Sequence, residues 1–222
     1  MSGRKEAMDM SILTKIKGPA DVKAIPAEEV GALCDAMRNA LVLRASRHTG
    51  HVGPNLGFVE ATVALHRVFE SPKDKIVFDV SHQCYAHKML TGRMQAYVDE
   101  DRYDDVSGYT EPGESEHDHF VVGHTSTSVS LATGLAKARD LRGERFNVIA
   151  VIGDGSLSGG EAFEGLNNAA EQGGNVTSVH HEHSNEGSQV NGCYLRLTLE
   201  TRNFEHIAAI KQALTDAGLK II

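Results

Sequence analysis

The stretch from Val148 to Gly160 constrains the fold of this chain more than any other. It opens with an apolar run rich in β-branched residues, which predicts a buried parallel strand over 148–152. Gly153-Asp154-Gly155 follows, and its two glycines let the backbone turn sharply and approach a ligand closely. Residues 161–172 are mostly good helix formers and predict a helix. A strand, a glycine-bracketed aspartate and a helix in this order indicate a layered α/β fold.

The same stretch predicts a binding site. The N-terminus of the following helix would present free N–H groups and a partial positive charge to an anion. The Asp154 carboxylate would repel a bound diphosphate unless a cation lies between them. Mg²⁺ held by a carboxylate and by phosphate oxygens removes that conflict. The pattern therefore favours a metal–diphosphate site at the carboxyl end of a strand, although Gly-Asp-Gly alone also occurs in plain turns.

Composition narrows the class of protein. A chain of 222 residues with 41% hydrophobic and 23% charged residues predicts one globular domain with a real core. The net charge of −8 argues against a nucleic-acid or anionic-membrane partner. No apolar run is long enough to span a bilayer, and residues 1–10 lack a signal-peptide core, so we expect a cytoplasmic protein. The 3 cysteines are far apart and give no disulfide framework.

Strands alternate with helices along the chain. Val30, Leu33, Cys34, Met37 and Leu41 form one apolar helical stripe, which predicts a helix from about Pro26 to Arg47. Residues 1–25 are expected to form an arm, because Gly18-Pro19 breaks any regular element. Further helices are expected over 58–69, 84–90, 129–141 and 204–214, and further strands over 75–80 and 175–183. The fold class is therefore α/β, a three-layer αβα arrangement with a mostly parallel sheet, in a single domain over 26–222.

Three other segments carry candidate site residues. The loop 48–57 holds two histidines and few charges; it is either a tight helix–helix connection or a loop that brings imidazoles to a substrate. His82 follows a predicted strand at its carboxyl end, where open α/β sheets bind ligands. The hydroxyl residues of 123–128 precede a helix and suggest a second anion or cofactor cradle. Residues 98–122 are polar and irregular, which indicates a functional or a mobile loop.

Six segments occur together in one order, and together they resemble a known family. They are Gly50-His51, Pro54-Asn55-Leu56-Gly57, Asp79-Val80-Ser81-His82-Gln83, His87-Lys88-Met89-Leu90-Thr91-Gly92-Arg93, Gly123-His124-Thr125-Ser126-Thr127-Ser128 and Gly153-Asp154-Gly155. The set resembles the N-terminal, diphosphate-binding domain of 1-deoxy-D-xylulose-5-phosphate synthase, a transketolase-like thiamine diphosphate enzyme. The resemblance extends from about residue 20 to about residue 175. It implies the thiamine diphosphate-binding, transketolase-like fold.

The resemblance also implies roles for individual residues. The family joins pyruvate, with loss of CO₂, to glyceraldehyde 3-phosphate for isoprenoid precursor synthesis. Asp154 would bind the Mg²⁺ that bridges to the cofactor diphosphate, and Gly155 and Ser156 would lie against that diphosphate. The other cofactor contacts would be Gly123, His124, Thr125 and His82. His51 and His82 are the candidate catalytic residues, with His51 near the reacting carbon as a proton-transfer or substrate-orienting group.

The chain departs from the family pattern after Asn175. The family closes its cofactor motif with Asn-Asp-Asn, and an ungapped count places that tripeptide at His181-Glu182-His183. The Asn ligand of Mg²⁺ therefore falls on His183, and the backbone-carbonyl ligand falls near Asn185. Imidazole suits Zn²⁺, Cu²⁺ or Ni²⁺ rather than Mg²⁺. His180, His181 and His183 form either a transition-metal site or a diverged segment that binds no metal.

The family continues with a pyrimidine-binding domain and a third domain, and we expect neither within these 222 residues. The leading hypothesis is thus a synthase-like transferase domain that is incomplete on its own and acts on small-molecule substrates. We expect a homodimer or a second chain that carries the pyrimidine domain. One alternative is the N-terminal subunit of a split transketolase-type enzyme. Another is a non-catalytic binding protein that retains the fold, which the His181-Glu182-His183 replacement favours.

Overall fold

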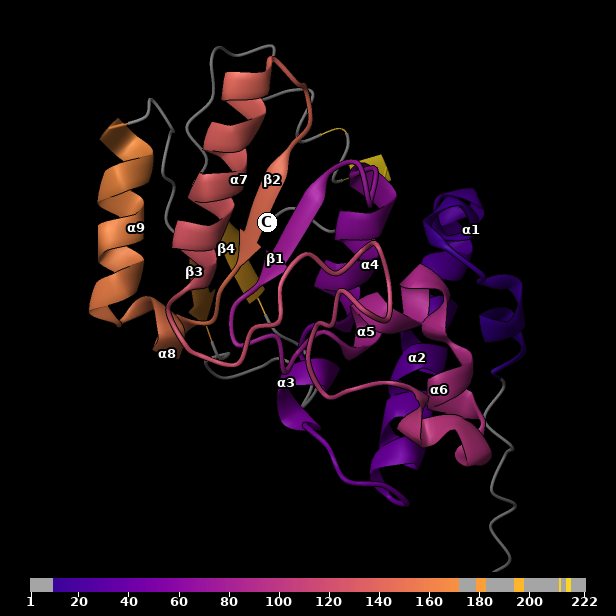
Figure 1. Ribbon diagram of the computed structural model, residues 1–222. Helices are drawn as coiled ribbons and strands as arrows, with labels where there is room; N and C mark the ends of the chain where they lie inside the picture. Colours follow the sequence, from indigo (N-terminus) through magenta and orange to yellow (C-terminus); the bar gives the residue numbers. More distant parts are fainter. Residues whose placement is uncertain (1–9, 172–178, 183–193, 198–211, 213–214, 217–222) are drawn as a thin grey trace, which may run out of the picture.

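The computed structural model of the protein describes residues 10–171, 179–182, 194–197, 212 and 215–216. Figure 1 labels the helices and strands of this part of the chain. The α-helices are α1 (Pro19–Ala24), α2 (Val30–Ala45), α3 (Gly53–Leu56), α4 (Val59–Val68), α5 (Tyr85–Lys88), α6 (Gln95–Val98), α7 (Ser128–Arg142), α8 (Asp154–Leu157) and α9 (Gly160–Glu171). Shorter helical turns are η1 (Ser11–Lys15), η2 (Ala27–Glu29), the π-turn η3 (Met89–Arg93) and η4 (Glu100–Asp105).

The described strands form two small sheets. Strand β1 (Lys75–Phe78) pairs in parallel with β2 (Val148–Val151), in a register that sets Lys75 opposite Val148 and Phe78 opposite Val151. Strand β3 (Val179–Glu182) pairs antiparallel with β4 (Tyr194–Leu197). The parallel pairing of β1 with β2 agrees with the expected mostly parallel sheet. The strand expected over 175–183 is seen only at 179–182, and its antiparallel partner β4 departs from the expected parallel arrangement. Helices combined with a small parallel sheet are compatible with an α/β fold.

The long helices lie close to where the periodicity predicts them. Helix α2 buries Leu33, Cys34, Met37 and Leu41 from the predicted stripe. Helices α4, α7 and α9 start and stop within two residues of the predicted bounds. Helix α7 ends at Gly143, whose φ of 66° is the left-handed conformation that closes many helices. The final helix expected over 204–214 lies outside the described residues, apart from residue 212.

Residues 10–25 belong to the core, so the expected N-terminal arm is wrong for this segment. Ile12, Leu13, Ile16, Val22 and Ile25 are all buried and belong to the main hydrophobic cluster. Gly18-Pro19 starts helix α1 instead of breaking the chain, because proline is well suited to the first helical turn. Asp21 Oδ2 accepts hydrogen bonds from the amides of Lys17 and Gly18 at 2.7 and 3.2 Å, and so fixes the entry to the helix.

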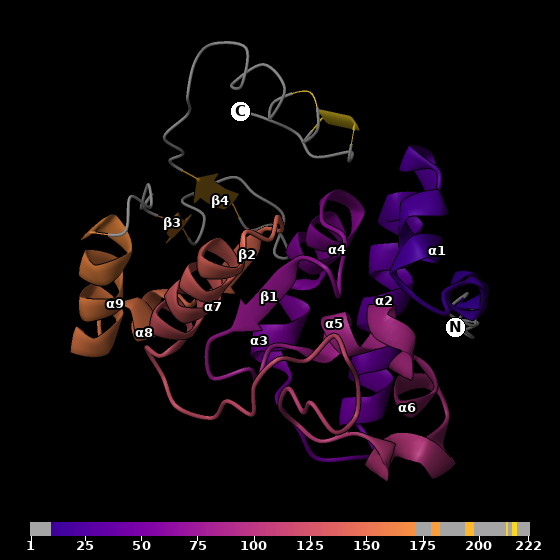
Figure 2. The same cartoon turned by 45° about the horizontal axis from the view of Figure 1, so that its top comes forward.

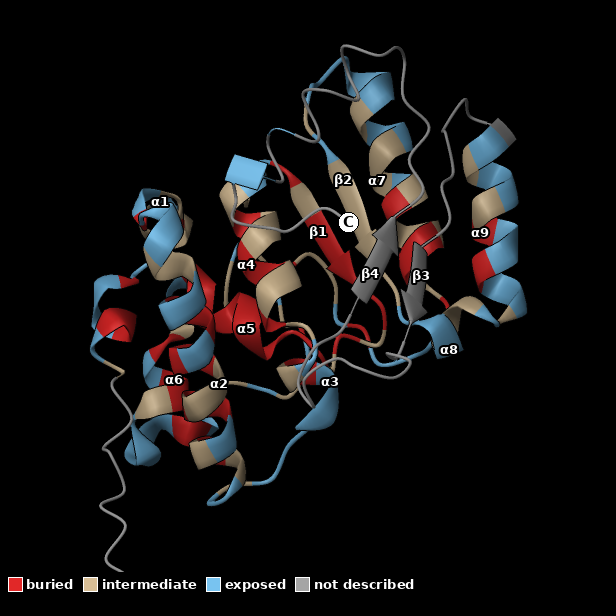
Figure 3. Ribbon diagram, turned by 180° about the vertical axis from the view of Figure 1, so that it is seen from behind, coloured by how far each residue is buried: buried red, intermediate tan, exposed pale blue. Residues whose placement is uncertain are grey.

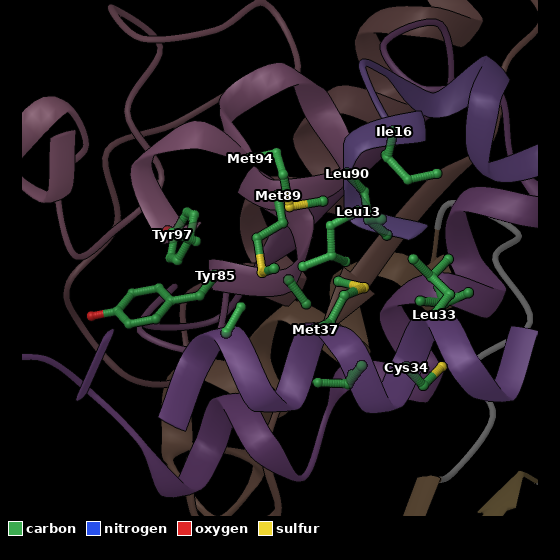
Figure 4. Packing of buried hydrophobic residues seen from close by; sticks show 14 of the residues in the cluster. Leu13, Ile16, Leu33, Cys34, Met37, Tyr85, Met89, Leu90, Met94 and Tyr97 are labelled. Carbon is green, nitrogen blue, oxygen red and sulfur yellow. The ribbon is translucent and has the colours of Figure 1, made fainter. Parts of the chain in front are cut away.

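The core lies between the N-terminal turns, α2 and the α5–α6 region. Figure 4 shows Leu13 and Met89 close to Met37 of α2, with Leu90 and Ile16 on the same side of that helix. In Figure 3 the buried residues concentrate in this half of the molecule and along β1. Helices α7 and α9 pack side by side at the other end, where exposure is greater (Figures 1 and 2). Strand β2 is only half-buried, although its apolar sequence predicts full burial.

Candidate functional site

The carboxyl ends of β1 and β2 bring two loops of predicted site residues to one edge of the sheet. The amide of Asp79, just after β1, donates to the carbonyl of Val151 at 2.7 Å. His82 follows Asp79 by three residues, and Asp154 follows Val151 by three residues. Both loops therefore leave the sheet at the same edge, as expected for a ligand site in an α/β fold.

The turn after β1 has an unusual backbone. Val80 and Ser81 have φ angles of 57° and 67°, in the left-handed region that a β-branched residue rarely adopts. Hydrogen bonds hold this turn: Ser81 Oγ donates to the carbonyl of Val122 at 3.1 Å and accepts from the amide of Thr110 at 3.1 Å. Backbone strain of this kind persists only where the surroundings enforce it, and it clusters at functional sites. This turn begins the loop that carries His82.

The imidazoles of His51 and His82, the two candidate catalytic residues, lie together. Their ring centroids are 5.2 Å apart in an edge-on arrangement, and the ring of Tyr109 lies 5.7 Å from that of His51. Burial lowers the pKa of His82, and the nearby His51 lowers it further, with Asp79 acting in the opposite direction. Nδ1 of His82 is buried and has no hydrogen-bond partner among the residues that the structure describes. The pair therefore contains a neutral imidazole with one nitrogen free for a ligand or water.

The N-terminus of α7 is occupied by a side chain of the protein itself. Asp79 is buried, and its two carboxylate oxygens accept from the amides of Ser126 and Ser128 at 2.8 and 2.9 Å. Asp79 therefore already occupies two amides at this helix end, and the anion or cofactor cradle expected from the hydroxyl residues and the helix N-terminus stays a prediction. What remains is an exposed loop, residues 123–125, that holds the predicted cofactor contacts Gly123, His124 and Thr125.

That exposed loop is joined to the Gly-Asp-Gly loop by Ser126. Ser126 has a φ of 72°, and its Oγ donates to the carbonyl of Ser156 at 2.6 Å. The contact is close because Gly159 has no side chain: a Cβ there would overlap the Ser126 hydroxyl. Gly123, Thr125, Gly155 and Ser156 therefore come from two adjoining loops, as the predicted cofactor site requires.

Asp154 is exposed at the start of α8, a single helical turn that the sequence did not predict. This turn separates Gly-Asp-Gly from the N-terminus of α9, so that helix end is farther from the motif than expected. The described residues form no ion pair with Asp154 and contain no group of three His, Cys, Asp or Glu side chains placed to hold a metal. A Cβ added at Gly123, Gly153 or Gly155 would meet nothing within 4 Å. A free carboxylate beside open backbone fits one half of a Mg²⁺–diphosphate site.

The other half of the predicted metal site falls outside the described part of the chain. His183 and Asn185 are not among the described residues. The backbones of His180 and His181 lie on β3, opposite Arg196 and Leu195. A transition-metal site at His180, His181 and His183 therefore stays a prediction.

A strap of irregular chain, residues 106–122, covers α5 and η3 and carries Tyr109 to His51. Two ion pairs fasten it: Lys88 Nζ to Glu114 at 2.7 Å, and Arg93 to both oxygens of Asp118 at 2.6 and 2.9 Å. Lys88 and Asp118 are fully buried, so these contacts are shielded from water. The loop expected over 98–122 is thus fixed in place, and it contains the short turn η4.

A chain of buried polar groups continues from Asp118. His87 Nε2 lies 3.0 Å from Asp118 Oδ1, and His66 Nε2 lies 2.9 Å from His87 Nδ1. Burial would raise the pKa of Asp118, but hydrogen bonds from Arg93 and His87 outweigh it and hold that pKa well below its usual range. Burial lowers the pKa of His87 and His66. His87 is therefore a neutral donor to an ionised Asp118, and His66 Nε2–H donates to His87.

Comparison with known proteins agrees with these motifs. The family model described as 1-deoxy-D-xylulose-5-phosphate synthase, for the N-terminal part of that enzyme, matches residues 13–216. This span includes every predicted site residue, from His51 to Asn185. The chain belongs to the 1-deoxy-D-xylulose-5-phosphate synthase family.

Individual members of the synthase family are similar over most of the chain. 1-Deoxy-D-xylulose-5-phosphate synthase 1 of Geobacter metallireducens is 52% identical over 159 residues, which are 72% of this chain and 25% of that protein. The synthases of Dictyoglomus turgidum and Carboxydothermus hydrogenoformans are 50% and 51% identical over 70% and 71% of this chain, and again 25% of each protein. The chain thus spans about a quarter of the length of the curated synthases it matches.

Three buried residues that organise the site have no role in the motif-based assignment. Asp79, Asn55 and Ser126 act through hydrogen bonds to backbone groups of distant loops. The only sequence signal for these three residues is that they lie inside the motifs quoted above.

None of the helices in the described part of the synthase-family chain has the length and apolarity needed to cross a membrane.

Proposed function

We propose that this chain is the diphosphate-binding domain of a thiamine diphosphate- and Mg²⁺-dependent transferase of the 1-deoxy-D-xylulose-5-phosphate synthase type. Its reaction would join pyruvate, with loss of CO₂, to glyceraldehyde 3-phosphate. The observation that carries the proposal is the convergence of three loops, those of His82, Gly123–Thr125 and Asp154–Ser156, at one edge of the β1–β2 sheet.

Each loop has a separate task in the proposed site. Asp154 would hold Mg²⁺, and the open backbone at Gly123 and Gly155 would lie against the diphosphate. The exposed carboxylate of Asp154 is available for a metal, because none of the described residues forms an ion pair with it. Asp79 already accepts from the Ser128 amide at the start of α7, and its negative charge is favourable at that helix end.

The histidines would handle protons beside the reacting carbon. The lowered pKa of His82 keeps its ring neutral near pH 7, and its unpartnered Nδ1 can accept or donate a hydrogen bond according to tautomer. The exposed ring of His51 lies next to it and can exchange protons with substrate. The bound cofactor would supply the thiazolium carbon that reacts with the substrate carbonyl. His51 and His82 would orient the substrate and exchange protons with it.

Asp154 is only part of the proposed cofactor site. Asp154 alone is an incomplete ligand set for Mg²⁺, and the family's pyrimidine-binding region lies in the remaining three quarters of its members. As partners we expect a second copy of the chain or a second chain that carries that region. The His181-Glu182-His183 segment favours a second candidate, a protein that keeps the fold and binds ligand without turnover.

An NMR titration tests the proposed site directly. Thiamine diphosphate added with Mg²⁺ should shift the amide signals of Gly123, Thr125 and Gly155, and should shift them far less without Mg²⁺. The Asp154→Asn variant should lose the Mg²⁺-dependent shifts, while the Asp101→Asn control, on the exposed η4 turn, should keep them. Unchanged spectra at millimolar cofactor, or the same shifts in Asp154→Asn, would overturn the proposal.

A further inference from the structure

Asn55 lies beneath the two histidines of the site and contacts the backbone of both. It is completely buried in the short helix α3. Its Nδ2 donates to the carbonyl of His51 at 2.7 Å and to the carbonyl of His82 at 2.8 Å. Its Oδ1 accepts from the amide of Tyr85 at 2.9 Å. The carboxamide thus uses both of its N–H groups and its oxygen within one small volume.

These bonds join segments that are far apart in the chain. His51 belongs to the loop after α2, whereas His82 and Tyr85 follow β1. A second contact supports the junction, because the amide of His51 donates to the Tyr85 hydroxyl at 3.2 Å. No backbone hydrogen bond between the two loops is found among the described residues. The Asn55 side chain is therefore the main connection between the backbones that carry the two imidazoles.

We propose that Asn55 is a positioning residue that sets the spacing and mutual orientation of the His51 and His82 imidazoles. The value of that geometry for cofactor chemistry rests on the proposed function. The positioning itself does not, since it concerns only groups within this chain. Serine or alanine at residue 55 could not span both carbonyls, and aspartate would set an acceptor against at least one of them.

The spacing has a measurable electrostatic consequence. Two imidazoles 5.2 Å apart disfavour protonation of one another, and the lowered pKa of His82 includes this effect. Asp79 is the other charged group that acts on His82, and Tyr85 and Tyr109 are the titratable groups beside His51. If Asn55 sets the spacing, its loss should let the rings separate and the His82 loop hydrate. Both changes raise the pKa of His82 toward its ordinary value.

The test is an NMR pH titration of the histidine ring signals in the full chain, with His51→Gln and His82→Gln used for assignment. In Asn55→Ala we expect the pKa of His82 to rise by about half a unit or more and the contacts between the two rings to weaken. Thr62→Val is the matched control. Thr62 is equally buried, and its hydroxyl donates to the carbonyl of Phe58 at 2.7 Å, within its own segment of the chain rather than to a histidine loop. Thr62→Val should lower the stability by about as much as Asn55→Ala does, but it should leave the His82 titration unchanged.

Asn55→Asp provides a second variant of nearly the same shape, in case alanine prevents folding. A folded Asn55→Ala or Asn55→Asp protein with an unchanged His82 titration and unchanged ring contacts would overturn the proposal. The same shift in Thr62→Val would also overturn it. Failure of the wild-type chain to bind thiamine diphosphate would count against the proposed function and leave the positioning role intact.

Discussion

The carboxylate of Asp79 accepts a hydrogen bond from the amide of Ser128 at 2.9 Å, across a sequence separation of 49 residues. Its other oxygen binds the amide of Ser126, so one buried side chain joins the end of β1 to the start of α7. The Ser126 hydroxyl extends the connection to Ser156 in the Gly-Asp-Gly loop. The loops of the candidate site are therefore held by internal hydrogen bonds before any ligand binds.

Replacing Asp79 should loosen this junction. Asp79→Asn keeps one acceptor oxygen and sets an NH₂ group against the other amide, which should cost about 1–3 kcal/mol of unfolding free energy. Urea denaturation gives that value directly. Asp35→Asn is the control, since the Asp35 side chain is 79% exposed, and it should change stability little. Equal stability of the two variants would mean that the helix cap contributes nothing.

Two neighbouring glycines offer a sharper test of the loop contact. In Gly159→Ala the new methyl group would overlap the Ser126 hydroxyl, so the 123–128 and 153–159 loops must separate. In Gly160→Ala the methyl group meets nothing within 4 Å. We expect the amide signals of Gly123 and Gly155 to shift in the first variant only. Matching spectra of the two variants would show that the loops are not in contact.

The stability of the 106–122 strap should depend more on buried Asp118 than on the exposed carboxylate of Glu100. Asp118→Ala leaves the Arg93 guanidinium, which is only 10% exposed, without its main partner, and should cost about 3–5 kcal/mol. Glu100→Ala removes the partner of exposed Arg47 and should cost about 1 kcal/mol or less. Protease digestion within 106–122 should accelerate only in Asp118→Ala. Similar urea midpoints for the two variants would contradict this role.

The buried histidines predict acid sensitivity. Burial lowers the pKa of His66 and His87, and it lowers that of His119 to about 4. The unfolded chain therefore binds protons that the folded chain does not, and stability should fall as the pH drops below about 6.5 and continue falling toward pH 4. His66→Gln keeps a donor toward His87 without titrating. Its fall in Tm between pH 7 and 5 should be smaller than that of the wild type by about 2–4 °C.

His124→Gln is the control for that experiment, because His124 is an exposed loop residue. Its thermal midpoints should follow those of the wild type at every pH. An equally steep pH dependence in His66→Gln would show that His66 is protonated in the folded chain.

Local sequence patterns predicted most helices and the positions of the strands β1 and β2, but not their pairing. The stripe from Leu33 to Leu41 identifies α2 because its period is that of a helix and its members are buried. The N-terminal segment was misjudged because Gly18-Pro19 indicates a break, although proline at the first helical turn serves equally well as a start. Burial of Ile12 and Leu13 depends on packing against α2, which no local pattern reports.

The site was predictable in its residue types and less so in its connections. His51 and His82 were identified as candidate catalytic residues from the family resemblance. The internal cap on α7 was not expected, because Asp79 and Ser126 are 47 residues apart and the hydroxyl residues alone suggest an open anion cradle. Asn55 reaches His82 over 27 residues in the same way. Contacts of this kind are set by the tertiary fold, so sequence periodicity cannot reveal them.

The most direct measurement of the central claim, that Asp154 and its loop form the intact half of a Mg²⁺–diphosphate site, is calorimetric titration with thiamine diphosphate and Mg²⁺. The wild-type chain should bind only weakly, with no binding at micromolar cofactor, because the family resemblance places His183 where a hard oxygen ligand of the metal is expected. His183→Asn should tighten binding by about tenfold or more, and adding Asp154→Asn should abolish the gain. Micromolar binding by the wild type, or a gain that survives Asp154→Asn, would contradict the claim.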